Sequence, residues 1–508
     1  MSASTMPAVV VTAGGTALTG HETRGLEEVR VQQRLSLPAQ CELAFSDPPG
    51  PLATAERLLP GTELRVDAGD GLPLFRGEVT ALEQVYGPAG QRQVRVRGYD
   101  RLHRLRKRQP VQARVQMTVV ELARELTRDL GLRVEAPGTE GPFRPWLIQH
   151  RRSDLQLLAE LAAEAGLYLA LRGETLHLVT LAGLDEPEVP LALGQTLFEA
   201  RLELNAEPAC RSVRAAGWDP LRVEPHSGQA STVRGGRQVA AEASPKAVGG
   251  SAQRSSMGQL LYGDDHARAT ARAELERRVA YEVALWGVTE GNARLRPGTP
   301  VRIGGVAQSM AGRYVLTAVT HTIDNRRDFT SEISTLPPLL GMGEDALGGV
   351  AVLGVVIEVD DPRHAGRLRA RLPGLGDVET DWMPVVLPGA GPDKGLVALP
   401  DVNDRVLVLL PNGEAGAGVV LGGLYGMGGP PDDGVDGNAV RRYTFATRGG
   451  QRVVLDDKKQ VLRLEDATGN VVELSENGVR ISAKGELALE APGRQVTIAG
   501  DQIDFKRK

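Results

Sequence analysis

The sequence predicts a mainly β, multidomain protein whose C-terminal part is one third of a trimeric, intertwined β-prism. The chain has 508 residues, which is enough for three or four domains. Its 61 glycines and its aromatic content of only 4% favour many short strands joined by turns. Residues 441–508 repeat short apolar alternations with glycines between them, which is the pattern of a strand repeat.

The N-terminal region, residues 1–115, consists of strand-like segments and is predicted to form a first β-barrel. Residues 116–195 follow as an insert with two helices and a hairpin. Thr118 is a candidate N-cap of the first helix. Ser153 and Gln156 form a capping-box pattern at the start of the second helix.

A second β-barrel is predicted for residues 196–335, and a linker for residues 336–349. Residues 226–259 are poor in large apolar side chains and rich in Gly, Ser, Ala and Gln, so we expect a long, weakly ordered excursion there. A helix is predicted over residues 265–282, because apolar residues recur along one of its faces. These residues are Ala267, Ala271, Leu275 and Val279.

Residues 350–426 are predicted to form a small barrel of the OB type, because five short strand-like segments follow one another closely. The segments are 352–359, 367–372, 382–387, 405–410 and 418–424. A second linker, residues 427–440, is rich in Gly, Pro and Asp, and the β-prism, residues 441–508, follows it.

The predicted prism segment carries too few apolar side chains to bury a core alone, and a single copy would leave strand edges unpaired. Three copies wound together would bury the inward-facing row and close these edges. The candidates for the buried prism core are Val461, Leu464, Leu474, Val479, Ile481, Leu489, Val496 and Ile498. These positions are structural, and we predict no catalytic, cofactor-binding or metal-binding residues.

The motifs argue against an enzyme. The sequence contains no G-x-S-x-G pentad, which a nucleophile elbow requires. The loop at residues 389–395 lacks the G-K-[ST] that places a lysine and a metal-binding hydroxyl at a phosphate. Adjacent aspartates such as Asp456 and Asp457 are typical of solvated turns. We therefore predict a protein that is not an enzyme and has no cofactor.

Nucleic acid is not a predicted partner. The formal net charge is −5, and the OB segment holds only Trp382 and Tyr425 as aromatic residues. Three arginines alternate along one strand of this segment, and we interpret them as a solvated or trimer-facing row. They are Arg367, Arg369 and Arg371. Tyr99 and His103 are expected to pack at a barrel corner.

Neither a disulfide framework nor a membrane span is predicted. Cys41 and Cys210 are the only cysteines and lie far apart in the sequence. The sequence shows no leader pattern and no apolar run of about 18 residues, so we expect assembly in the cytoplasm. The last histidine is His364, and no cysteine follows it, so the prism lacks residues for a metal site built from nitrogen and sulfur ligands.

Several stretches resemble, in order, the VgrG and phage-tail hub–spike family. FRGEV and VRGYDRLHRL resemble its first barrel, and QHRRSDLQLL and VRAAGWDP resemble its helix and second-barrel entry. The third group runs in the order of the family's spike OB domain. It consists of DP at 361–362, GR at 366–367, PGAG at 388–391 and VLGGLY at 420–425. With the β-rich C-terminal segment, the resemblance covers nearly the whole chain.

This resemblance implies a homotrimeric central spike of a contractile injection system. Its hub would carry two β-barrels per chain and would meet a hexameric inner tube and baseplate proteins. An OB collar and a needle would follow, and a metal-bound tip protein of the PAAR type would cap the needle. The particle would puncture a target envelope mechanically, either released outside the cell or anchored to it. Within the family, the resemblance favours the spikes of extracellular phage-tail-like systems, and the alternative is a phage or type VI spike that carries or is an enzymatic effector.

Overall fold

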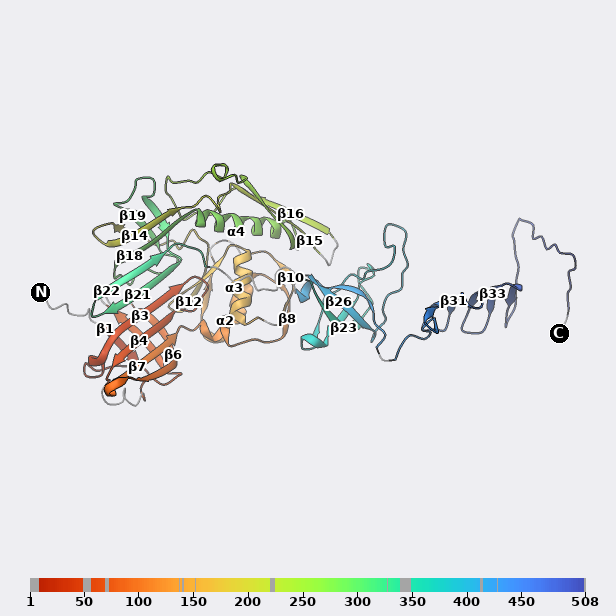
Figure 1. The fold of residues 1–508 in the computed structure, drawn as a ribbon, viewed down its shortest axis with the longest axis horizontal. Coiled ribbons are helices and arrows are strands. Elements are labelled where there is room, and N and C mark those ends of the chain that lie inside the picture. Colours follow the sequence, from red (N-terminus) through yellow and green to blue (C-terminus); the bar gives the residue numbers. More distant parts are fainter. Residues whose placement is uncertain are drawn as a thin grey trace. The chain divides into compact units, whose positions relative to one another are not determined.

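The computed structural model describes residues 9–48, 56–68, 73–136, 138, 141–150, 152–219, 224–326, 328–338, 349–411, 414–426 and 428–506. The chain divides into two compact units, residues 1–423 and residues 424–508. Strands dominate both units, which confirms the predicted mainly β fold (Figure 1). No described helix combines the length and the apolar character needed to cross a membrane. Most of the predicted linker 336–349 lies outside the described residues.

The largest element of the first unit is an eleven-stranded sheet. Its strands, in spatial order, are β14 (Leu197–Leu204), β18 (Val283–Glu290), β22 (Asp328–Ser334), β21 (Ala318–Asp324), β3 (Leu26–Arg34), β4 (Gln40–Ser46), β7 (Arg92–Tyr99), β6 (Pro73–Tyr86), β5 (Glu63–Ala68), β1 (Val9–Ala13) and β2 (Thr16–Ala17). The antiparallel pairing of β21 with β3 joins strands of the two predicted barrel regions into one sheet. Figure 1 shows these red and green strands side by side.

Each half of this sheet has its own apolar core. The first core includes Val29, Val31 and Phe45, and the second includes Leu285, Val319 and Ile333. In β3 and β4 the buried residues alternate with more exposed ones, which is why one face of the sheet is apolar.

The predicted insert contains α2 (Val119–Thr127) and α3 (Asp154–Glu164), and α1 (His103–Arg106) directly precedes it; these helices pack beside short strands. Both predicted helix starts are confirmed. The side chain of Thr118 accepts from the backbone N–H of Glu121, and that of Ser153 accepts from the backbone N–H of Gln156. The strands are β8 (Gln112–Met117), β9 (Arg133–Glu135), β10 (Arg144–Gln149), β11 (Tyr168–Arg172) and β12 (Thr175–Val179).

The expectation of a weakly ordered excursion at 226–259 is wrong for both ends of that segment. β16 (Glu224–Ala230) and β17 (Gln253–Leu260) flank β15 (Ser212–Asp219) in a three-stranded sheet, which packs on α4 (Asp264–Glu282). Between them the chain is tied to α4 by ion pairs, and Val239 and Ala241 pack against the second apolar core. Arg234 pairs with the buried Glu276, Nε to Oε1 2.7 Å. A further small sheet contains β13 (Val189–Ala192), β19 (Pro300–Gly304) and β20 (Gly312–Val315).

The OB domain is a five-stranded sheet in the order β25-β24-β23-β26-β27. Its strands are β23 (Val350–Glu358), β24 (Arg369–Leu372), β25 (Val378–Glu379), β26 (Arg405–Leu410) and β27 (Val419–Gly423). Four of the five predicted segments correspond to these strands. The segment 382–387 contributes only isolated bridges, Met383 to Leu368 and Val385 to Val420, because it crosses between strands instead of pairing along one.

The second unit is an antiparallel meander. A two-stranded pair, β28 (Val435–Asp436) and β29 (Ala439–Val440), precedes a five-stranded sheet in sequence order. The strands of this sheet are β30 (Arg442–Ala446), β31 (Arg452–Asp456), β32 (Val461–Glu465), β33 (Val471–Ser475) and β34 (Gly478–Ser482). We call it the needle sheet. In the single chain, the described residues after β34 form no strand.

Candidate assembly surfaces

One face of the needle sheet is entirely apolar. The register places Phe445 opposite Val453, and Val453 opposite Leu464. Leu464 lies opposite Val472, which in turn lies opposite Ile481. Directly opposed residues share a face, and so do residues two apart along a strand. The face therefore consists of Tyr443, Phe445, Val453, Leu455, Leu462, Leu464, Val472, Leu474, Val479 and Ile481; we call it the apolar needle face.

This face is uncovered in the single chain. Eight of its ten side chains are exposed, with exposed fractions between 37% for Leu462 and 70% for Val479. The opposite face is polar: Arg463 pairs with Glu473 at 2.9 Å and with Glu465 at 3.3 Å. A contiguous apolar surface of this kind on a soluble protein marks an interaction site. The needle sheet is therefore built to be covered on one face only.

The predicted prism-core residues divide into three groups. Leu464, Leu474, Val479 and Ile481 lie on the apolar needle face. Val461 pairs with Asp456 and lies on the opposite face with Arg463. Leu489, Val496 and Ile498 follow the last strand and are exposed. Their burial in a prism stays a prediction.

The sequence analysis missed six members of this face. They are Tyr443, Phe445, Val453, Leu455, Leu462 and Val472. The first four lie in RYTFA and RVVLD, where apolar side chains also recur at every second residue. The sequence therefore contains the apolar alternation that marks these strands. Where two neighbouring residues are both apolar, only the cross-strand register shows which of them belongs to the face.

The OB domain has a second exposed apolar face. Its inner residues, such as Val356, Val406 and Val408, are buried, whereas the alternating outer residues are not. Leu353, exposed by 57%, lies opposite Leu407. The apolar part of the outer face, which we call the OB apolar face, comprises Ala351, Leu353, Leu407, Leu409, Val419 and Leu421. Arg371 and Arg405, which lie opposite Val355, border it.

The arginine row of the OB domain is neutralised by carboxylates of the same domain. Arg367 pairs with the buried Asp361 at 2.6 Å, and this interaction holds the pKa of that carboxyl well below its usual range. Arg369 lies 2.7 Å from Glu358, and Arg371 lies 3.0 Å from Asp377. The row is not a free basic groove of the kind that binds single-stranded nucleic acid.

The predicted barrel corner is confirmed. His103 is buried and its Nε2 lies 2.5 Å from Oε1 of Glu78, while its ring stacks on Tyr99 at 6.1 Å. Arg104 also pairs with Glu78, and this hydrogen bond lowers the pKa of Glu78 to about 2. These contacts tie α1 to β6. Among the described residues, no cluster of His, Cys, Asp and Glu could hold a metal ion.

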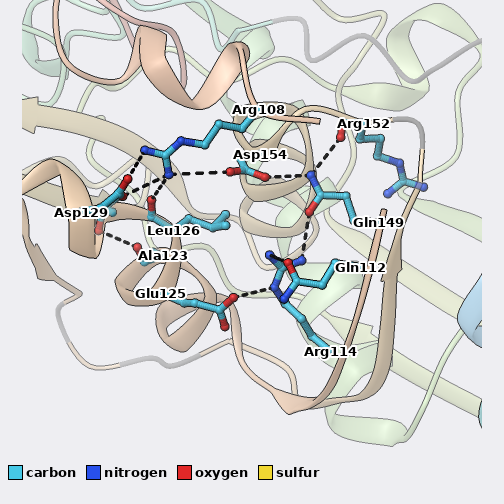
Figure 2. Close-up of polar contacts among 11 residues, drawn as sticks. Arg108, Gln112, Arg114, Ala123, Glu125, Leu126, Asp129, Gln149, Arg152 and Asp154 are labelled. Atoms are coloured by element: carbon cyan, nitrogen blue, oxygen red, sulfur yellow. Dashed lines mark hydrogen bonds and ion pairs between the residues drawn. The ribbon is translucent and has the colours of Figure 1, made fainter. Parts of the chain in front are cut away.

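A polar network lies between the helices of the insert and the pair β8–β10 (Figure 2). Gln149 is its centre: its Nε2 donates to Asp154 at 2.9 Å, and its Oε1 accepts from Arg114 at 2.9 Å. Arg114 continues to Glu125 of α2 at 2.9 Å, and Arg108 binds Asp129. Arg114, Gln149 and Asp154 are all buried. Because each charged member has a partner, the network fixes the position of the β8–β10 pair.

Two family models match the chain. The model of the phage tail baseplate hub matches residues 32–326, and that of the type VI secretion system and phage-baseplate injector OB domain matches residues 352–425. The chain belongs to the phage tail baseplate hub family. No curated protein sequence matches it significantly.

Solved structures share the fold at low sequence identity. A Francisella PdpA–VgrG complex, in its half-lidded form, has a TM-score of 0.55 and 8% identity, over 93% of this chain and 87% of that one. An Escherichia coli protein is described as a component of the type VI secretion system with structural similarity to the T4 bacteriophage tail proteins gp27 and gp5. It has a TM-score of 0.52 and 13% identity, over 79% of this chain and 96% of that one. The expected hub–spike resemblance is confirmed.

Proposed function

We propose that the chain is the homotrimeric central spike of a contractile injection system and acts mechanically, without enzymatic activity of its own. The hub part would join a hexameric tube and its baseplate to the OB domain and the needle. The needle would then be driven through a target envelope. The observation that carries this proposal is the apolar needle face, which a single chain leaves uncovered.

Three copies can cover this face and give the needle its stiffness. Each sheet would turn its apolar needle face inward and leave the Arg463 face in solvent. Burial of eight exposed large side chains per chain gives a large apolar driving force. The remaining residues up to 506 could then pair between chains, which would provide backbone partners that the single chain does not offer.

The OB apolar face supports association of the same three chains through the OB domain as well as through the needle. It lies on the first unit, whereas the apolar needle face lies on the second. Two separate uncovered apolar surfaces on one chain are easiest to explain when both are buried by copies of that chain. A trimeric OB collar followed by a trimeric needle would bury both apolar surfaces.

The remaining partners follow from the same proposal. The tip would be a separate PAAR-type protein, because the needle residues offer no histidine or cysteine to seal a metal-bound point. The spike would assemble in the cytoplasm and then become part of a released or cell-anchored particle, reaching the target membrane only transiently.

Native mass spectrometry of the full-length chain tests the trimer. The expected mass is three times that of the 54.2 kDa chain. Replacing Leu464 and Leu474 together by Asp should yield monomers, because the buried core would then contain six unpaired carboxylates per trimer. Arg480→Ser on the polar face is the matched control and should leave the trimer intact. A folded, monomeric wild-type chain would rule out the spike.

A further inference from the structure

The β8–β10 pair, which we call the ribbon, has two different faces. Ile148 lies opposite Ala113, and Trp146 lies opposite Val115. Residues two apart along a strand share a face, so these four apolar residues form one side of the ribbon. The other side carries Gln112, Arg114, Leu147 and Gln149.

The apolar side of the ribbon belongs to the core of the OB domain. Ile148 is buried in the same cluster as Val356, Leu372 and Val408, all of which are OB residues. Ala113 and Trp146 pack against this cluster and are partly buried by it. A strand pair within residues 112–149, about 200 positions earlier in the sequence, therefore completes the OB core.

The polar side of the ribbon belongs to the insert. Leu147 lies in the apolar cluster formed by α2 and α3. Arg114 and Gln149 are the central members of the network in Figure 2. Since Ile148 is buried on one side and Arg114, Leu147 and Gln149 on the other, the ribbon cannot rotate away from either neighbour without exposing apolar or charged groups.

Two OB loops fit closely around the ribbon. The turn η8 (Ala415–Ala417) brings Gly416 so near that a Cβ there would lie 2.9 Å from the backbone oxygen of Trp146. At the other loop, a Cβ on Gly376 would lie 3.0 Å from Val111, which directly precedes β8. Glycine permits both approaches, to a backbone atom at Gly416 and to the Val111 side chain at Gly376.

An ion pair lies beside these apolar contacts. Arg152, between β10 and α3, binds Glu414 of the OB domain at 2.7 Å and Glu160 of α3 at 3.0 Å. One arginine thus connects a carboxylate of the insert with one of the OB domain, and all three side chains are partly buried. We expect this ion pair to contribute to the orientation of the OB domain on the ribbon.

We propose that the ribbon is a self-sufficient docking site for the OB domain, so that hub and OB domain form one body without the covalent connection through residues 336–349. Thrust on the hub then passes through the ribbon into the OB domain. The covalent connection only keeps the two parts at high local concentration. This inference concerns contacts inside one chain and is independent of how many chains associate.

Cleavage of the connection tests the docking site. A protease site is inserted after residue 343 of the full-length chain, and the cut protein is analysed by size exclusion with both fragments followed on a denaturing gel. The OB–needle fragment should elute with the hub fragment. Separation of the two fragments in the wild-type background would overturn the proposal.

Two glycine variants show whether the ribbon is what retains the OB–needle fragment on the hub fragment after cleavage. Gly416→Val should release the OB–needle fragment after cleavage, because the side chain meets the Trp146 backbone. Gly374→Val, in another loop of the same domain, has open space around its Cβ and should keep the fragments together. Equal behaviour of the two cut variants, whether retained or released, contradicts the proposal.

A charge reversal provides a second test of the docking site, which does not depend on whether the Gly416→Val variant folds. Arg152→Glu places three carboxylates together and should weaken retention after cleavage at low salt by at least tenfold. Adding Glu414→Arg to this variant again places one positive charge between two carboxylates and should restore retention. If the double variant is no better retained than Arg152→Glu, the ion pair does not orient the OB domain.

Discussion

At the residue scale, buried ion pairs fix the turns in which the family motifs lie. Asp361 accepts from the backbone N–H groups of Arg363 and Ala365 while it binds Arg367 in a bidentate pair. The DP and GR dipeptides of the OB domain are thus two ends of one turn. The two residues act together: the carboxylate organises the loop, and the arginine compensates its buried charge.

Asp361→Ala should destabilise the OB domain by about 3–5 kcal/mol, because the nearly buried guanidinium of Arg367 loses its partner. The free energy of unfolding from denaturant titration measures this loss. Asp377→Asn is the control, since asparagine tolerates the positive φ of this position, +59°. Arg371, the partner of Asp377, is 45% exposed, and the expected cost is below about 1 kcal/mol. Equal costs would show that burial does not determine the strength of these pairs.

Asp100 should make stability depend on pH near neutrality. Burial raises the pKa of this carboxyl to about 7, although it accepts backbone N–H groups of Ala39 and Leu102. The folded-state pKa therefore lies above the unfolded value of about 4. Between these values the folded state holds a proton that the unfolded chain has lost, so stability falls as pH rises from about 4 through about 7.

Thermal unfolding of wild type and Asp100→Asn at pH 5 and pH 8 checks this sign. The wild-type contribution from Asp100 is at most about 1.4 kcal/mol per pH unit, and the variant should show a flatter dependence. Parallel pH profiles for the two proteins would mean that Asp100 does not titrate in this interval.

At the element scale, the segment before the needle sheet is tied to it. Asp432 binds Arg442 of β30 at 2.6 Å and accepts from Thr444 at 2.7 Å. The backbone N–H groups of Arg441 and Arg442 both donate to the oxygen of Gly434. Residues 432–440 were expected to act as a linker, but these contacts fix them to the base of the needle sheet.

Gly434→Ala should loosen this base. The φ of Gly434 is +68°, and an added Cβ would lie 2.3 Å from the backbone oxygen of Arg442, so the two segments must separate. Gly437→Ala is the control, since its φ is +65° and its Cβ meets nothing. The control should cost about 1–3 kcal/mol of local strain, and Gly434→Ala more. The rate of limited proteolysis between residues 424 and 440 measures the difference, and similar rates would contradict it.

At the scale of the whole molecule, the division into two units predicts the result of truncation. A chain that ends at Gly426 retains the whole first unit and lacks the needle sheet. It should remain folded and soluble but lose resistance to SDS and the ability to support envelope penetration by the assembled particle. SDS gels of unheated samples and a penetration assay check these results. SDS resistance in the truncated chain would place the stabilising contacts outside the needle.

Sequence periodicity by itself determined where several helices and strands of this protein begin and end. The capping boxes at Thr118 and Ser153, the helix near residues 265–282 and the strand repeat after residue 441 depend on neighbours a few positions apart, so local patterns are sufficient. The motif order also indicated the family. The segment 226–259 was misjudged because its ends are ordered by pairing with β15 and its middle by contacts such as Arg234–Glu276, neither of which composition reveals.

Only the tertiary structure decided which distant segments meet. The pairing of β21 with β3, the completion of the OB core by Ile148 and the membership of Tyr443 and Phe445 in the apolar needle face all depend on register or long-range contact. A shift of one residue in register would turn each of these side chains to the other face. Sequence periodicity therefore fixes how strands alternate, and packing between segments fixes what each face covers.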